Sequence, residues 1–374
     1  MAAAQIRVVY LVYGLEYGGA EGQLMEQAAR LPPSRYKRTL VTFAPCEWIT
    51  NRMKDSGVDL LCLEKRGRAD LRWFLRLRRL LADSKPQIVH CVGESANLWG
   101  RLAALSLRPR PAVIASTGTL LLGLDPWQRF SVRVLSRTCN CVIGNSEQVV
   151  QRLWALGVPK RKTRCIMNGV DLGRFTRTWD RAGVLEAEGL DPALPLVLSV
   201  GRLSPEKGQV NLIAAAKLLR ERGVGAQFAI AGQGLLGSLL RDEIARQGLA
   251  GRFHLLPARR EVAPLLHACN VFVLPSLEEG LSNALLEAMA CSKPCVSSRV
   301  GGCQYLIADG ERGFLVEAGD VQALADRIAR YLGDNELRET HGRNAAEFVR
   351  EHHSVERMVR DYEALYEEIA SPGR

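Results

Sequence analysis

Two cations follow a predicted strand in the second half of the chain. In "SVGRLSPEKG" (199–208), Arg202 and Lys207 stand five residues apart across a turn containing a proline. An arginine fork and a lysine point charge at the carboxyl edge of a sheet suit a diphosphate group. The alternative is a solvated loop with ordinary surface charges.

Two glutamates flank the start of a predicted helix in "EEGLSNALLEAMA" (278–290). Glu279 precedes the helix, and Glu287 lies on its second turn among apolar residues. Ser282 or Asn283 is expected to cap this helix, whose first backbone N–H groups and dipole favour an anion. The alternatives are a surface acid for Glu279 and a hydrogen-bonded structural acid for Glu287.

Two glycine-rich turns also follow predicted strands. "YGGAEG" (17–22) opens a helix and lets the backbone approach a ligand, although an ordinary tight turn fits equally. "GQGLLG" (232–237) matches the dinucleotide fingerprint, which expects an acid at the end of the next strand. That strand instead ends in "HLLPARR" (254–260), so a nicotinamide-dependent oxidoreductase stays only an alternative hypothesis.

Short apolar strands alternate with helical segments along the whole chain, which predicts parallel sheets covered on both faces. One set of strands precedes residue 175 and a second set follows residue 195, so two doubly wound α/β domains are expected, with the boundary near 175–185. The expected strands are 6–13, 38–44, 58–64, 87–92, 112–117, 140–146, 196–201, 226–232, 252–257, 271–275, 294–298 and 313–317. Ligands bind at the carboxyl ends of such strands, and two facing domains would enclose a cleft.

Composition narrows the class of protein. The 374 residues include 47% hydrophobic and 24% charged residues, typical of a soluble globular protein. We expect a cytoplasmic protein without a transmembrane helix, because "VVYLVY" (8–13) is only strand-sized. The ten cysteines lack zinc-like spacing and are expected to be buried free thiols.

Charge is distributed unevenly. Residues 1–180 hold 28 basic and 14 acidic residues, whereas the remainder holds 22 basic and 26 acidic residues. The basic half predicts an anionic partner, which could be a membrane surface, nucleic acid or an acidic substrate. The amphipathic helix "RWFLRLRRLL" (72–81) is one candidate for that contact, with a solvated face on a core helix as the alternative. No nucleic-acid motif accompanies this helix. The sequence also contains no DxD pair, the pattern that would predict a carboxylate-bound metal ion.

The chain resembles the retaining glycosyltransferases of family 4, which have the GT-B fold of two Rossmann-like domains facing across a cleft. The motifs that carry this resemblance are "YGGAEG", "VGRLSPEKG", "AGQG", "LPSLEEGLSNALLEAMA", "VGG" (300–302) and "DGERGFLV" (309–316). The resemblance implies an acceptor-binding domain over 1–178, a nucleotide-sugar-binding domain over 179–350, and a C-terminal helix (351–374) that returns to the first domain.

The resemblance also implies roles for individual residues. Arg202 and Lys207 would hold the donor diphosphate, with backbone N–H groups from Gly280, Leu281, Ser282 and Asn283. Glu287 would bind ribose hydroxyls, and Glu279 would hold the donor sugar as a catalytic residue. Gly18 and Gly19 would approach the donor from the other domain. His90 matches a family histidine and is a second catalytic candidate, whereas Thr117–Gly118 stands where many relatives carry another histidine.

The implied reaction is metal-independent transfer of a sugar, with retention, from a nucleotide-diphosphate sugar to a glycan or lipid-linked acceptor. A UDP-sugar is favoured, and no cofactor is expected. The protein would be cytoplasmic, with the inner face of an anionic membrane as a candidate peripheral location, and would not bind nucleic acid. A GT-B epimerase or hydrolase of nucleotide sugars and a non-catalytic binding protein are the remaining alternatives.

Overall fold

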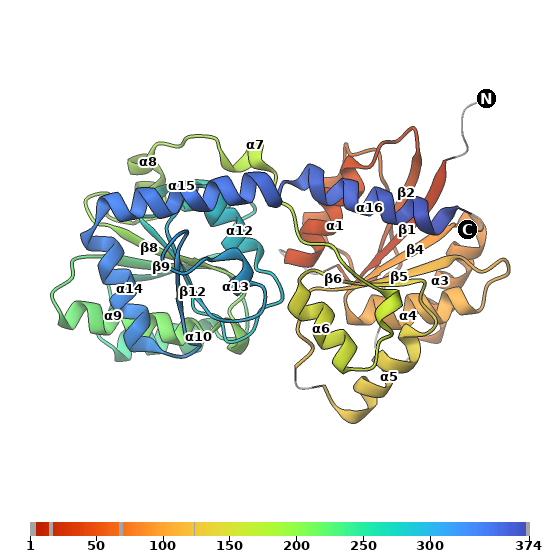
Figure 1. Ribbon diagram of the computed structural model, residues 1–374, viewed down its shortest axis with the longest axis horizontal. Helices are drawn as coiled ribbons and strands as arrows, with labels where there is room; N and C mark the ends of the chain where they lie inside the picture. The colour runs from red at the N-terminus through yellow and green to blue at the C-terminus, as the bar shows by residue number, and fades with distance from the viewer. Residues whose placement is uncertain (1–4, 15–17, 67–69, 123, 372–374) are drawn as a thin grey trace. The chain divides into compact units, whose positions relative to one another are not determined.

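The computed structural model describes residues 5–14, 18–66, 70–122 and 124–371, which form two α/β units (Figure 1). The first unit spans Met1–Gly169 and Val355–Arg374, and the second spans Val170–Ser354. Each unit contains a parallel sheet covered by helices, so the predicted pair of doubly wound Rossmann-like units is confirmed.

The first unit is built on a seven-stranded sheet in the order β3-β2-β1-β4-β5-β6-β7. The order reverses between β1 and β4, and this pair is the topological switch point of the sheet. The strands are β1 (Ile6–Val12), β2 (Tyr36–Thr42), β3 (Asp59–Cys62), β4 (Ile88–Val92), β5 (Ala112–Thr117), β6 (Cys141–Gly144) and β7 (Thr163–Cys165).

Helices cover both faces of this sheet. They are α1 (Gly19–Arg30), α2 (Glu47–Met53), α3 (Leu71–Ser84), α4 (Glu94–Leu105), α5 (Pro126–Ser136), α6 (Glu147–Ala155) and α16 (Val355–Ala370), with a short 3₁₀ helix at Lys160–Lys162. On β1, Val8 and Tyr10 pack with α1, α2 and α16, whereas Val9 and Leu11 pack with α3, α4 and α6. Because successive side chains enter opposite cores, the strand is apolar throughout.

The second unit contains a six-stranded sheet in the order β10-β9-β8-β11-β12-β13, with its switch point between β8 and β11. Its strands are β8 (Leu196–Val200), β9 (Gln227–Ala231), β10 (Phe253–Leu256), β11 (Val271–Leu274), β12 (Cys295–Ser298) and β13 (Phe314–Val316). Its helices are α7 (Leu172–Phe175), α8 (Arg181–Ala187), the 3₁₀ turn Pro205–Lys207, α9 (Gln209–Glu221), α10 (Gly237–Arg246), α11 (Ala263–Ala268), α12 (Asn283–Ala290), α13 (Cys303–Leu306), α14 (Val321–Gly333) and α15 (Asn335–His352).

The structure differs from the sequence expectations in two details. Strand β7 was not predicted, because it has only three residues and follows a basic segment. The unit boundaries lie at 169/170 and 354/355, rather than at 178/179 and 350/351. The segment after Val170 belongs to the second unit because Arg174 pairs with Glu261 at 2.9 Å, and His267 Nε2 lies 2.9 Å from the carbonyl oxygen of Phe175.

All ten cysteines are free thiols, and most are buried, as expected. Burial raises the pKa of Cys91 and of Cys303 to about 12, so these thiols stay protonated at neutral pH. No helix in the described ranges is long and apolar enough to cross a bilayer.

Helix α16 lies over the sheet of the first unit (Figure 1), and His90 belongs to strand β4 of that sheet. Its side chain is 0% exposed. Nδ1 lies 2.6 Å from the hydroxyl of Tyr366 on α16, and Nε2 lies 2.6 Å from the hydroxyl of Ser116 on β5. Gln27 of α1 donates to the same tyrosine at 2.5 Å. His90 therefore anchors the last helix to the sheet.

Burial also gives His90 a pH-dependent effect on stability. It lowers the pKa to about 3, so between about pH 6.5 and pH 3 the unfolded chain takes up a proton that the folded chain excludes. Stability should therefore fall as pH decreases through this window, by up to about 1.4 kcal/mol per pH unit from this group. Urea unfolding of His90→Asn from about pH 8 to about pH 5 should show a shallower pH dependence than that of the natural protein. The exposed His352→Asn is the control, and equal slopes for His90→Asn and the natural protein would contradict the assignment.

Candidate active site

Two loops meet at the switch point of the second sheet. One loop leaves the carboxyl end of β8 and reaches Gly208, and the other leaves β11 and ends at Ser282 before α12. Neighbouring strands β8 and β11 form the switch point of this sheet, and ligands of doubly wound sheets bind at the carboxyl ends of such a pair. The residues that the sequence singled out in 199–208 and 278–290 therefore come together at one sheet edge.

Lys207 and Glu279 form an ion pair across these loops. Lys207 Nζ lies 2.7 Å from Glu279 Oε1, and Ser276 Oγ donates to the same oxygen at 2.8 Å. Glu279 is 7% exposed and Ser276 is fully buried, while the lysine side chain is 22% exposed. Within the described chain Oε2 of Glu279 accepts no hydrogen bond, so it is available to a ligand hydroxyl. Sequence reasoning missed Ser276, which fixes the orientation of the carboxylate.

Backbone hydrogen bonds hold the two loops at this distance. The carbonyl of Glu206 accepts from Leu277 N at 2.8 Å and from Glu278 N at 3.2 Å. The side-chain carboxylate of Glu206 bonds within its own loop, where it accepts a hydrogen bond from Ser204 Oγ at 2.6 Å. Burial acts to raise the pKa of Glu206, but the Ser204 hydroxyl, a backbone N–H and the nearby cations outweigh it and lower the pKa.

Arg202 supplies a second cation on the β8 loop. Its side chain is exposed, whereas its backbone is fixed because its carbonyl accepts from Gln209 Nε2 at 2.7 Å. Gln209 is the first residue of α9 and is 3% exposed. The structure thus presents one exposed cation, Arg202, and one cation already paired with a carboxylate, Lys207.

Helix α12 begins beside Glu279. Ser282 caps it by accepting from Leu285 N at 3.3 Å, as predicted, and the first N–H groups of such a helix have no partner within it. Gly280, Leu281, Ser282 and Asn283 form the approach to this end; Leu281 and Ser282 are buried.

Glu287 is half-buried on the next turn of α12, between the buried residues Leu286 and Ala288. The loop after β12 supports the start of α12 from the other side, because Gly302 N donates to the carbonyl of Gly280 at 2.6 Å. Gly301 has φ +44°, and a Cβ there would overlap with the carbonyl oxygen of Glu279. Only glycine lets this loop pack so closely behind the acidic residue.

The glycines of "GQGLLG" have a packing role. A Cβ at Gly232 would overlap with the carbonyl oxygen of Gly201, and one at Gly234 would overlap with the backbone of Leu203. The loop after β9 therefore nests on the loop after β8. Arg259, at the end of the next strand, is bound by Glu188, with Nε 3.0 Å from Oε1. The motif that suggested a dinucleotide site thus supports the β8 loop instead.

In the first unit, Gly18 and Gly19 begin α1 after the β1 loop. Gly18 is the N-cap, and the carboxylate of Glu21 lies where a Cβ of Gly18 would stand. Glu21 is 6% exposed and was not singled out by sequence reasoning. The first residue of "YGGAEG", Tyr17, lies outside the described residues.

His90, the other predicted catalytic residue in the first unit, lies beneath α16 with both ring nitrogens engaged. These contacts assign His90 to the packing of α16, and its catalytic role stays a prediction.

Two amides lie at the strand ends of the first sheet. Asn97 Nδ2 donates to the carbonyl of Ser116 at 3.0 Å, and the amide of Asn145 lies beside Gly118. The Oδ1 atoms of both are buried and have no hydrogen-bond partner in the described chain. Because Gly118 has no side chain, the Asn145 amide lies in the space that a Cβ there would need, with Nδ2 2.9 Å from that position.

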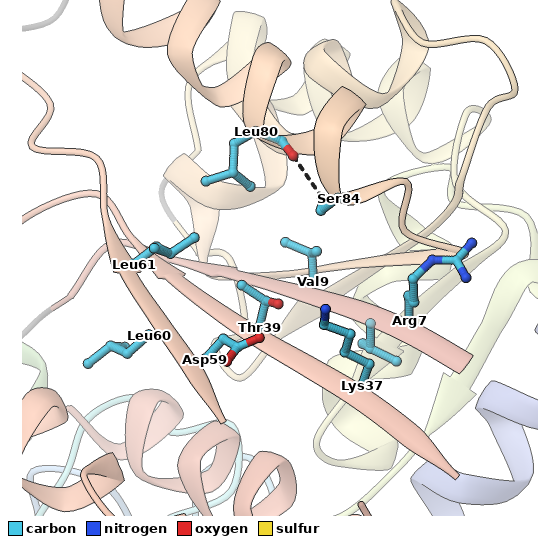
Figure 2. A pocket seen from close by; sticks show the side chains of 10 residues that line it. Arg7, Val9, Lys37, Thr39, Asp59, Leu60, Leu61, Leu80 and Ser84 are labelled. Carbon is cyan, nitrogen blue, oxygen red and sulfur yellow. Dashed lines mark hydrogen bonds between the residues drawn. The ribbon is translucent and has the colours of Figure 1, made fainter. Parts of the chain in front are cut away.

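A pocket of about 390 Å³ lies elsewhere in the first unit (Figure 2). Arg7, Lys37 and Asp59 line it near the amino ends of β1, β2 and β3, with Leu80 and Ser84 of α3 above them (Figure 2). Ligands of doubly wound sheets bind at the opposite, carboxyl, ends. This pocket is therefore not part of the candidate site.

Two family models match the chain. Residues 17–174 match the model described as "Glycosyltransferase Family 4", and residues 184–348 match "Glycosyl transferases group 1". The chain belongs to glycosyltransferase family 4. It is an enzyme that transfers a sugar from a nucleotide sugar, and the resemblance predicted from its motifs is confirmed.

Two curated relatives are similar over more than half of the chain. An Escherichia coli "UDP-Gal:alpha-D-GlcNAc-diphosphoundecaprenol alpha-1,3-galactosyltransferase" is 28% identical over 304 residues, or 78% of each chain. The lipopolysaccharide core glycosyltransferase LpsE of Rhizobium meliloti is 34% identical over 54% of this chain and 56% of its own length.

Solved structures share the GT-B fold. Anabaena Alr3699/HepE, crystallised with UDP and glucose, has a TM-score of 0.86 at 22% identity and covers 97% of this chain and all of its own. Sucrose-phosphate synthase from Thermosynechococcus elongatus has a TM-score of 0.83 at 20% identity and covers 98% of this chain and 99% of its own.

The nested glycine in the β9 loop allows a direct test of how the site is supported. Gly232→Ala should push the β8 loop outward, because the new Cβ overlaps with the Gly201 carbonyl, and should destabilise the protein by roughly 1–3 kcal/mol. Gly201→Ala is the matched control, since a Cβ there meets nothing within 4 Å. Chemical denaturation of both variants measures the difference. Equal stability of the two variants would contradict the nested arrangement.

Proposed function

We propose that this enzyme transfers a sugar from a UDP-sugar, with retention of anomeric configuration and without a metal ion, to a lipid-linked or polysaccharide acceptor. The observation that carries the proposal is the Lys207–Glu279 pair at the switch point of the second unit. The names of relatives supply the substrate class. The Escherichia coli enzyme uses UDP-Gal and a diphosphoundecaprenol-linked acceptor, and HepE binds UDP and glucose.

In this proposal the second unit holds the donor. Arg202 and Lys207 bind the diphosphate and stabilise the charge that develops on it as the sugar departs. The N–H groups at the start of α12 add donors to the same phosphates. Glu287, on the next turn, accepts hydrogen bonds from ribose hydroxyls. The exposed Arg202 can move onto the phosphates without breaking an existing ion pair.

Glu279 holds the donor sugar. Its Oε1 is engaged by Lys207 and Ser276, so Oε2 accepts from sugar hydroxyls and its charge favours the positive charge developing at the anomeric carbon. The acceptor oxygen forms a bond to that carbon on the face from which the phosphate leaves. The bond to the phosphate oxygen breaks, and the acceptor proton passes to the departing phosphate.

The first unit takes the acceptor in this proposal. Asn97 and Asn145 have buried amide oxygens at the strand ends that lack a hydrogen-bond partner in the described chain. These oxygens could accept hydrogen bonds from hydroxyls of the acceptor glycan. The excess of basic residues in this unit fits an anionic membrane that carries a lipid-linked acceptor at its cytoplasmic face.

Neutralising or removing the paired groups should separate transfer from nucleotide binding. Glu279→Gln should lower the transfer rate by about a hundredfold or more and leave UDP affinity equal or higher, because Lys207 loses a competing carboxylate. Lys207→Ala should weaken UDP binding by at least about tenfold, since a charge-assisted contact is lost. Calorimetric titration with UDP and a radiolabelled transfer assay measure these quantities.

The exposed Lys217→Ala on α9 is the matched control for Lys207→Ala. Natural rates and UDP affinity in both site variants would show that the donor binds elsewhere. Release or interconversion of the sugar in the absence of any acceptor would instead support an epimerase or hydrolase.

The stereochemical and metal assignments have their own test. Among the described residues no group of three or more His, Cys, Asp or Glu side chains could hold a metal ion. Under the proposed reaction, transfer should continue at an undiminished rate after exhaustive chelation, and NMR of the first product should show the α-configuration of an α-linked donor. Loss of activity on chelation with recovery on adding Mg²⁺, or an inverted product, would contradict these assignments.

A further inference from the structure

Helix α5 presents an apolar stripe beside a basic stripe. Phe130 is 55% exposed and Val134, four residues on, is 37% exposed. Arg129, Arg133 and Arg137 repeat at the same spacing and are also exposed. Residues four apart share a helix face, so the two stripes run side by side along the helix. This is the pattern of a helix that lies in a membrane interface.

The basic stripe continues onto the loop between α6 and β7. The side chain of Arg133 lies against Gly157, with its Cδ 3.1 Å from where a Cβ would stand. Lys162 Nζ donates to the carbonyl of Arg137 at 2.6 Å. These contacts place the exposed cations Lys160 and Arg161 beside the C-terminal half of α5.

Few acidic residues offset these charges. Residues 101–165 hold 11 basic and two acidic residues, Asp125 and Glu147. Asp125 is engaged in the capping box of α5, where its carboxylate accepts from Gln128 N at 2.7 Å. Within the described ranges no carboxylate is in ion-pair distance of Arg133, Arg137, Lys160 or Arg161, so their charges are available to an anionic partner.

Helix α3, the candidate suggested by the sequence, uses its apolar stripe differently. Trp73, Leu77 and Leu81 are all 0% exposed and belong to the core of the first unit. Its arginines therefore lie on a solvated face together with the exposed Leu75. A bilayer interface requires exposed apolar side chains next to the cations, and α5 meets this requirement better than α3.

We propose that the α5 surface, formed by Phe130, Val134, Arg133, Arg137, Lys160 and Arg161, binds the headgroup region of an anionic membrane. This inference rests on the proposed function and locates its membrane contact. The cations pair with lipid phosphates, and the two apolar side chains enter the interface between headgroups and acyl chains. Exposed apolar side chains beside the cations favour a bilayer over nucleic acid, whose backbone needs cations alone.

Vesicle flotation with the full-length protein tests this surface. The natural protein should float with vesicles of phosphatidylglycerol and phosphatidylcholine, but not with phosphatidylcholine alone. Combining Arg133→Gln, Arg137→Gln, Lys160→Gln and Arg161→Gln should weaken binding by roughly 600-fold, because each of the four interfacial cations contributes a factor of about five. Phe130→Ser with Val134→Ser should weaken binding at high salt, where the apolar contribution remains.

The matched control removes four exposed cations from the second unit: Arg241→Gln, Arg246→Gln, Arg343→Gln and Arg350→Gln. It should bind vesicles within about threefold of the natural protein if the local surface decides binding. Equal losses of vesicle binding in the control and the α5 variant would overturn the proposal. An α5 variant that floats like the natural protein would also overturn it, including one that has lost binding to an RNA probe.

The UDP-induced shift in melting temperature separates this inference from the proposed function. An α5 variant that keeps this shift but loses flotation supports the surface. Absence of the shift in the natural protein would count against the proposed donor and leave the vesicle result to decide the membrane contact.

Discussion

A carboxylate that is almost completely buried needs a cation, and the arrangement of the second unit follows from this requirement. Glu279 meets Lys207 from 72 residues away in the sequence, and removing one partner of a buried pair typically costs about 3–5 kcal/mol. The pair forces the loops after β8 and β11 into contact. The Glu206 carbonyl then binds two N–H groups of the facing loop, and the start of α12 is fixed beside both charges.

The glycines around the site are a consequence of the same constraint. Three further segments press on the paired loops: the loop after β9, the loop after β12 and the first turn of α9. Side chains at Gly232 or Gly301 would separate these segments from the loops that they support. The cations and the acid are thus held by backbone packing, which requires little reorganisation when a ligand binds.

Much of this site was predictable from the sequence, because residue type and position after a strand are local signals. Arg202, Lys207, Glu279 and the cap at Ser282 were all identified in this way. Contacts between distant segments were not predictable. "GQGLLG" matches a fingerprint in its own residues, but its partner is Gly201, about thirty positions earlier. The spacing of Phe130 and Val134 is the same whether a helix faces a core or solvent, so the exposed stripe of α5 was missed.

The position of α16 has a consequence for how the protein is made. Val355, Met358, Val359, Leu365 and Tyr366 belong to the core that also contains β1 and α1. The second unit, Val170–Ser354, contains all of its own strands before α16 is synthesised. On a ribosome the unit that begins first therefore completes its core last, after the unit behind it has the whole of its sequence available. Until α16 emerges, the first unit has one face of its sheet covered only in part, by α1 and α2.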